Sequence, residues 1–187
     1  MAAGFFSPNK SVTGGCAFFS FNSKDGSVFV KLLKQVANNI DKKGNFDGKN
    51  ALNIKLTEDE AAGFIRAVRT CGRCSFFHKS EKGDTQITFN HYVIKPKTPE
   101  EKERQGYGLT VKRGAQEIKV GFTMDAAERL SEYMKFALTH IFSADYSADL
   151  KAHKENMAKK AAQGGGEVQK EPEAEKVPES QSDDEVF

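Results

Sequence analysis

The sequence predicts an α+β protein made of two similar halves, each an antiparallel β-sheet followed by one helix. Several short runs between residues 16 and 122 are rich in Phe and Val or alternate apolar with polar side chains, as strands do. Residues 54–62 resemble residues 120–127, because each segment ends a strand, provides a capping threonine and continues into an amphipathic helix. The two threonines, Thr57 and Thr123, are 66 positions apart, which indicates a weak internal repeat.

The first half contains three predicted strands and a helix. Residues 16–21 and 28–36 are typical of strands, and the Asp25-Gly26 pair between them is a hairpin signal. Residues 52–56 alternate apolar and polar side chains, which predicts a half-buried strand. The helix begins after Thr57, a capping residue with Glu three positions later, and is expected to end near residue 70.

The second half repeats this order with one more strand. Four strand-like runs lie at residues 75–79, 86–94, 107–113 and 117–122. Residues 95–106, between the second and third runs, hold two prolines and many charges, so we expect an exposed loop there. A long helix begins after Thr123, presents an apolar stripe and is expected to end near residue 162.

We therefore expect a mobile N-terminus at residues 1–15, one folded domain at 16–162 with halves at 16–72 and 73–162, and a disordered tail at 163–187. The tail is rich in Gly, Pro and Glu and cannot bury enough apolar surface to offset its ordering entropy. Its eight acids and two lysines give it a net charge of −6, which leaves +8 for the rest of the chain. This asymmetry is expected of a protein that binds polyanions, although a soluble domain with a solvating tail would show it too.

The composition predicts neither a membrane protein nor an exported one. No run approaches the ~18 apolar residues of a membrane helix, and the start of the chain lacks the charged and then apolar pattern of a signal peptide. The three cysteines form no disulfide framework, which favours a reducing compartment. We expect a cytoplasmic protein, associated with the nucleoid or, if viral, present in the host cytoplasm, with no membrane partner.

The last five residues, Asp183, Asp184, Glu185, Val186 and Phe187, form an acidic tip that ends in an aromatic ring. This tip resembles the C-terminus of single-stranded DNA-binding proteins of the bacterial and podophage types. The resemblance implies that the tail competes with DNA for a basic groove. It also implies that the tip recruits replication and repair proteins.

The element order over residues 16–142, in which antiparallel strands lead into a helix twice, resembles the Whirly and transcriptional positive cofactor 4 families. These families bind single-stranded nucleic acid across sheet surfaces, and the resemblance implies a homo-oligomer. No signature motif accompanies it, so no residue role is carried over. The alternative is an OB-fold barrel, which has five strands and usually one helix between the third and fourth. About seven strand candidates and a late long helix fit that barrel less well.

A sequence-tolerant single-strand binder needs cations that follow the phosphates and aromatic rings on which bases stack. The predicted strands interleave both kinds of side chain, and alternation turns one set towards the open side of each sheet. The residues that we expect to bind are Phe19, Phe21, Lys31, Lys55, Phe77, Lys79, Asn90, Tyr92, Lys112 and Lys119. Two adjacent pairs, Phe18-Phe19 and Phe76-Phe77, favour exposed rings, because one member of each must point away from the other. The alternative is that the Phe residues belong to the core and the lysines form a solvated face.

Metal and catalytic sites are weakly indicated. Cys71 and Cys74 have the spacing of a zinc knuckle, with His78 nearby and Cys16 or His91 to complete the set. No second C-x-x-C motif exists, so we expect free thiols and no metal or other cofactor. The sequence also lacks a Gly-rich phosphate loop, a nucleophile elbow and a metal-binding carboxylate cluster, so we expect no enzyme.

These observations predict a non-catalytic single-stranded DNA-binding protein that serves DNA replication, recombination and repair. Its expected partners are single-stranded DNA, other copies of the chain and the replication or repair proteins bound by its tip. One alternative is an RNA-binding or annealing factor, or a transcription cofactor, on the same scaffold. Another is a protein-binding adaptor whose acidic tail only keeps it soluble.

Overall fold

The computed structural model describes residues 2–37, 45–81, 83–96, 98 and 102–163. By internal packing the chain divides into two units, Met1–Asp149 and Leu150–Phe187, and both sheets belong to the first unit. The predictions for the acidic tip at residues 183–187, and for disorder in the tail before it, lie outside the described residues. Neither helix of the described chain combines the length and the apolar composition needed to cross a bilayer.

Nine strands and two helices follow one another in the described part of the chain. They are β1 (Ala2–Ser7), β2 (Gly15–Asn22), β3 (Ser27–Ala37), β4 (Asn45–Phe46), β5 (Leu52–Leu56), α1 (Glu58–Arg69), β6 (Arg73–His78), β7 (Thr85–Ile94), β8 (Arg104–Arg113), β9 (Gln116–Thr123) and α2 (Met124–Gln163).

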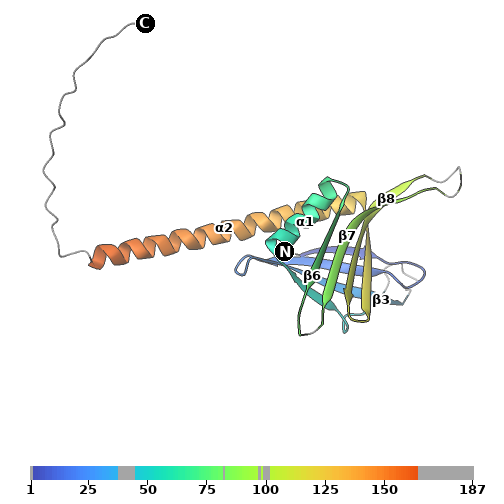
Figure 1. Cartoon of the computed structure of the whole chain (residues 1–187), viewed down its shortest axis with the longest axis horizontal. Helices are drawn as coiled ribbons and strands as arrows, with labels where there is room; N and C mark the ends of the chain where they lie inside the picture. The colour runs from blue at the N-terminus through green and yellow to red at the C-terminus, as the bar shows by residue number, and fades with distance from the viewer. Residues whose placement is uncertain (1, 38–44, 82, 97, 99–101, 164–187) are drawn as a thin grey trace, which may run out of the picture. The chain divides into compact units, whose positions relative to one another are not determined.

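The strands form two separate antiparallel sheets. The first sheet runs β1-β2-β3-β5, with the short β4 also paired to β3, and the second runs β6-β7-β8-β9. The strands of the two sheets run across one another (Figure 1). The predicted fold class is therefore confirmed: each half is an antiparallel sheet that leads into one helix, and the chain does not form a single OB barrel.

The N-terminal residues 1–15 were expected to be mobile, but part of this segment is a strand. Residues 2–7 instead form β1, which pairs with β2 from Ala2 opposite Ser20 to Ser7 opposite Gly15. Phe5 on this strand is only 3 % exposed, because it packs against the Phe19 and Phe122 rings at centroid distances of 5.7 and 5.1 Å. Tertiary burial, rather than any local pattern in this Gly- and Ala-containing run, orders the strand.

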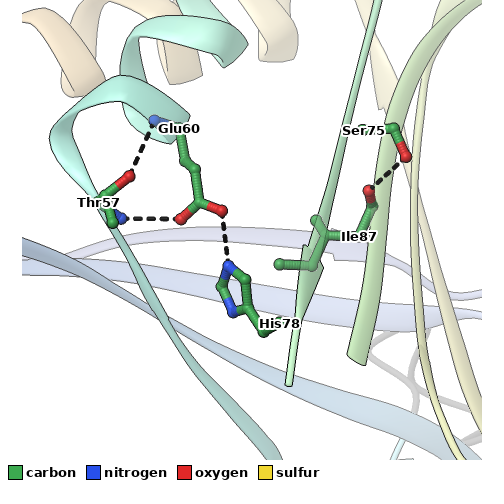
Figure 2. Close-up of polar contacts among 5 residues, drawn as sticks. All are labelled: Thr57, Glu60, Ser75, His78 and Ile87. Atoms are coloured by element: carbon green, nitrogen blue, oxygen red, sulfur yellow. Dashed lines mark hydrogen bonds and ion pairs between the residues drawn. The ribbon is translucent and has the colours of Figure 1, made fainter. Parts of the chain in front are cut away.

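Both helices begin with the capping chemistry that the repeat predicts. The Thr57 hydroxyl accepts a hydrogen bond from the Glu60 amide at 3.3 Å, and the Glu60 carboxylate accepts one from the Thr57 amide at 2.9 Å (Figure 2). The Thr123 hydroxyl accepts a hydrogen bond from the Ala126 amide at 3.2 Å. Each cap satisfies an amide that the first helical turn would otherwise leave unpaired.

One core lies between the sheets, with both helices contributing to it. The Phe64 ring of α1 reaches both sheets, with its centroid 6.3 Å from that of Phe19 and 5.0 Å from that of Phe89. The start of α2 adds Ala127, Leu130, Met134, Ala137 and Ile141. The sheets meet closely where a Cβ added to Gly15 would lie 2.7 Å from the Lys119 carbonyl oxygen. This packing uses the inner face of each sheet and leaves the other face of each towards solvent.

Candidate nucleic-acid interface

Strands β6 to β9 present one continuous set of polar side chains on the side away from the core. Their register places Phe77, Gln86, Lys112 and Glu117 in one row and Ser75, Thr88, Thr110 and Lys119 in the next. We call this surface the second-sheet outer face; it comprises Arg73, Ser75, Phe77, Gln86, Thr88, Asn90, Tyr92, Thr110, Lys112, Glu117 and Lys119. It brings together five of the residues that the sequence predicts to bind: Phe77, Asn90, Tyr92, Lys112 and Lys119.

A shallow hollow of about 350 Å³ lies in the middle of this face. Its lining is polar and comes from three strands: Gln86, Thr88, Thr110, Lys112, Glu117 and Lys119. Glu117 stands between the two lysines, with one carboxylate oxygen 3.4 Å from Lys112 Nζ and the other 3.5 Å from Lys119 Nζ. Although desolvation opposes it, contact with the two ammonium groups lowers the pKa of Glu117, so the carboxylate is ionised at neutral pH. The hollow carries a net positive charge, and exposed ion pairs of this kind separate at little cost.

Phe77 is the most exposed aromatic side chain on the second-sheet outer face, at 58 %. Its neighbour Phe76 points the other way, where its ring lies 6.0 Å from that of Phe64 in the core. The predicted orientation of this adjacent pair is confirmed. Because Phe77 stands in the same row as Lys112, the face offers an accessible π-surface together with a cation, which is the combination that base stacking and phosphate contact require.

The Tyr92 side chain lies against a glycine of the neighbouring strand. Gly106 is directly opposite it in β8, and a Cβ at Gly106 would lie 2.9 Å from the Tyr92 hydroxyl oxygen and 3.1 Å from the ring carbon that bears it. The glycine therefore creates the space for the ring. Tyr92 is half-buried, so a smaller part of its ring is available than for Phe77.

A second hollow of about 590 Å³ continues from the first and shares Thr88 with it. Asn90 lines it, with its side-chain amide donating to the His91 carbonyl oxygen at 3.2 Å. His91 also lines it, and Nε2 of this ring is the only buried side-chain nitrogen or oxygen without a hydrogen-bond partner among the described residues. The two hollows extend the polar surface along the sheet.

The structure corrects the prediction for the first strand of the first half. Phe19 is fully buried, and Phe21 packs on α2, with its ring stacked on that of His140 at 5.7 Å and edge-on to that of Phe136 at 5.8 Å. Neither ring is on the open side of the sheet. The face assignment for β2 was inverted, because the core lies on the side of Phe19 and Phe21 and the remaining side belongs to Phe18.

An aromatic cluster that the sequence analysis did not predict occupies the outer face of the first sheet. The Phe6 ring, 57 % exposed, lies 5.4 Å from that of Phe18 and 5.9 Å from that of Phe46. A partial signal was present in the adjacent Phe18-Phe19 pair, because one member had to point away from the core, and Phe18 does so opposite Lys31. Phe6 and Phe46 gave no such signal, because they lie on β1 and β4, which were not predicted.

The remaining predicted cations lie away from the second-sheet outer face. Lys31 and Lys55 are exposed on the outer face of the first sheet, opposite Phe18 and Phe29 respectively. Lys79 is exposed just after the end of β6. The ten predicted residues are thus divided among two sheet faces, one strand end and, for Phe19 and Phe21, the packed interior.

The cysteines and histidines considered as zinc ligands are not gathered into one site. Within the described ranges no group of three or more potential metal ligands occurs. Cys71 is exposed, Cys74 and Cys16 are buried, and burial raises the pKa of each buried thiol to about 11, which disfavours the thiolate that a metal would need. His78 instead contacts Glu60, with Nε2 and Oε1 separated by 2.6 Å (Figure 2).

Comparison with known proteins gives similarity at the level of structure. No protein-family model and no curated protein sequence matches the chain. The structure of the plant transcriptional regulator PBF-2 superimposes with a TM-score of 0.51 and 12 % identity, over 80 % of this chain and 94 % of that one. The Trypanosoma bruciei MRP1/MRP2 structure gives a TM-score of 0.46 and 16 % identity, over 73 % of this chain and 83 % of that one. The likeness to PBF-2 concerns the fold alone, and it agrees with the predicted order of two antiparallel sheets that each lead into a helix.

Proposed function

We propose that the chain is a non-catalytic protein that binds single-stranded nucleic acid on its second-sheet outer face. The observation that carries this proposal is the exposed Phe77 ring in the same row as Lys112, beside a hollow in which Lys112 and Lys119 outnumber the single carboxylate of Glu117. Single strands expose both base faces and phosphates, so a flat surface with a free ring and cations can hold them without reading sequence. The likeness to the plant transcriptional regulator PBF-2 supports the proposal by fold analogy.

The proposal extends to a role in the cell. We propose single-stranded DNA as the ligand, replication, recombination and repair as the processes, and a cytoplasmic homo-oligomer as the working form. The charge division of the sequence supports a tail that competes with DNA for the basic surface. The acidic tip at residues 183–187 would then engage partner proteins when DNA displaces the tail.

The direct test is fluorescence anisotropy of a labelled oligo-dT over a salt series, with duplex DNA and single-stranded RNA of equal length as competitors. We expect salt-sensitive binding that duplex DNA does not compete for, because a duplex hides its base faces. Stronger competition by RNA than by DNA would assign the surface to RNA, since the 2′-hydroxyl is the group that distinguishes them. An absence of binding at low salt, with and without residues 164–187, would overturn the proposal.

Removing the tail tests its proposed competition with DNA. A chain that ends at Gln163 loses a net charge of −6 and should bind oligo-dT more tightly than the full chain, with the largest difference at low salt. The same assay with a tail in which Asp183, Asp184 and Glu185 are replaced by Asn and Gln should give an intermediate affinity. Equal affinities for all three proteins would contradict the competition.

A further inference from the structure

A groove lies where the edges of the two sheets come together. β5 is an edge strand of the first sheet, paired only with β3 among the described strands, and β6 is an edge strand of the second, paired only with β7. Residues from both edges and from the β8 end line a hollow of about 470 Å³ between them. Its charged lining consists of Lys55 from β5, Lys79 after β6 and Arg113 at the end of β8.

Arg113 is held in a fixed position across the groove. Its Nε donates to the Thr85 hydroxyl at 2.7 Å and its Nη2 donates to the Asn53 carbonyl oxygen at 3.1 Å, so the guanidinium connects the second sheet to the first. A guanidinium has five N–H donors in a rigid fork, and these two bonds leave others for a ligand. Because the side chain is already ordered, an anion that binds here costs little further side-chain entropy.

No carboxylate lines the groove, although Glu60 is close by. One Glu60 oxygen contacts His78 Nε2 at 2.6 Å and the other accepts from the Thr57 amide at 2.9 Å, so the helix cap and the His78 ring engage this carboxylate (Figure 2). Lys55 Nζ lies 3.6 Å from the Asp25 carboxylate, but both side chains are largely exposed and such a pair is weak. No ion pair of Lys79 or Arg113 occurs within the described residues. The lining of the groove therefore carries a net positive charge.

The groove adjoins the second-sheet outer face at the same end of the sheet. The row that contains Phe77, Gln86 and Lys112 lies on the outer face, and the next row, His78, Thr85 and Arg113, lies on the groove side. Lys55, on the other wall, belongs to the outer face of the first sheet. A linear polyanion that leaves the Phe77 row would meet these three cations in turn, whereas a small isolated anion would need only one or two of them.

We propose that backbone phosphates of the bound single strand occupy this groove, on Lys55, Lys79 and Arg113. The strand then continues from the second-sheet outer face past the edges of β6 and β5 towards the first sheet. This inference rests on the proposed function and adds to it the path that the bound strand follows over the protein. It also assigns Arg113, which the sequence analysis did not include among the binding residues.

The test uses the full chain and counts phosphate contacts. The double substitution Lys55→Gln with Lys79→Gln removes two exposed charges and should leave the thermal transition unchanged. For single strands, the slope of log K against log salt falls by about 0.7 whenever one lysine–phosphate interaction is removed. We therefore expect the slope for a labelled oligo-dT to be shallower by about 1.4 in the double variant. The matched control is Lys135→Gln with Lys154→Gln, which removes two exposed lysines of α2 and should keep the wild-type slope.

The outcomes separate the groove from the proposed function. If wild-type protein binds oligo-dT and the groove variant keeps its slope, the path is overturned while the function stands. If the α2 control reduces the slope as much as the groove variant does, the effect is one of general charge and the path is again overturned. If wild-type protein binds no single strand at low salt, both proposals fall together. Inorganic phosphate, added against a chloride control of equal ionic strength, should compete only weakly, and strong competition would mean a small-anion site in place of a strand path.

Discussion

The first and second sheets are both antiparallel meanders that lead into a capped helix, but their outer faces carry different side chains. The outer face of the first sheet carries a cluster of Phe rings that contact one another, with Phe6 the most exposed. The second-sheet outer face is polar and cationic and holds one large exposed ring, Phe77. The two halves therefore share their secondary structure but not their outer surfaces. The inner face of each sheet must be apolar to form the core, whereas the outer faces are not constrained in this way.

The sharpest way to test this comparison is to remove one exposed ring from each face. Phe77 and Phe6 are 58 % and 57 % exposed, so Phe77→Ala and Phe6→Ala form a matched pair. Phe77→Ala should weaken oligo-dT binding by about 1–3 kcal/mol, or roughly 5- to 150-fold, because a stacking platform is removed. Phe6→Ala should change binding much less and should lower the melting temperature, because Phe18 and Phe46 then have one packing partner fewer. Equal reductions of affinity in anisotropy would show that both faces bind.

The junction between the sheets should be more sensitive to added volume than an exposed turn. Gly15→Ala would place its Cβ 2.7 Å from the Lys119 carbonyl oxygen and should cost about 1–3 kcal/mol of unfolding free energy, as overpacking does. Gly48→Ala is the control, because no heavy atom lies within 4 Å of the added Cβ. Chemical denaturation of both variants measures the difference. A neutral Gly15→Ala would mean that the sheets move apart easily at this point.

The smallest expected effect concerns the carboxylate in the second-sheet hollow. Glu117→Gln removes the one negative charge between Lys112 and Lys119 and should tighten oligo-dT binding by up to about 5-fold, since exposed ion pairs are worth ~0.2–1 kcal/mol. Glu132→Gln, which removes the partner of Lys135 on α2, should leave the affinity unchanged. Weaker binding by Glu117→Gln would show that the carboxylate positions the lysines for the ligand and does not compete with it.

The directions of the side chains were more predictable from the sequence in the second sheet than in the first, for a physical reason. In β8 Lys112 follows the apolar Val111, and in β9 Lys119 stands between Ile118 and Val120, so the cost of burying a charge fixes which side of these strands faces solvent. In β2 the residues on both sides are apolar or small, so alternation alone does not distinguish Phe18 from Phe19. Pairing with β1 and packing of α2 made that choice, and both depend on contacts remote in sequence.

Arg113 shows a second limit of prediction from the sequence. Its position at a strand end predicts an exposed cation, but its role follows from two hydrogen bonds, one to Thr85 in its own sheet and one to Asn53 in the other. Asn53 is 60 residues away in the chain. No local pattern encodes such a contact, so the groove between the sheet edges could be found only in the folded chain.

The sequence by itself determined the two sheet-plus-helix halves, both helix starts and the outward direction of Phe77, Lys112 and Lys119. These features depend on short-range rules: alternation along a strand, capping of a first turn and the cost of burying an ammonium group. The tertiary structure alone decided that the halves form two sheets, that β1 joins the first of them and that Phe19 and Phe21 are packed inside. Those outcomes depend on which apolar surfaces meet, and that is set by the mutual packing of elements far apart in the chain.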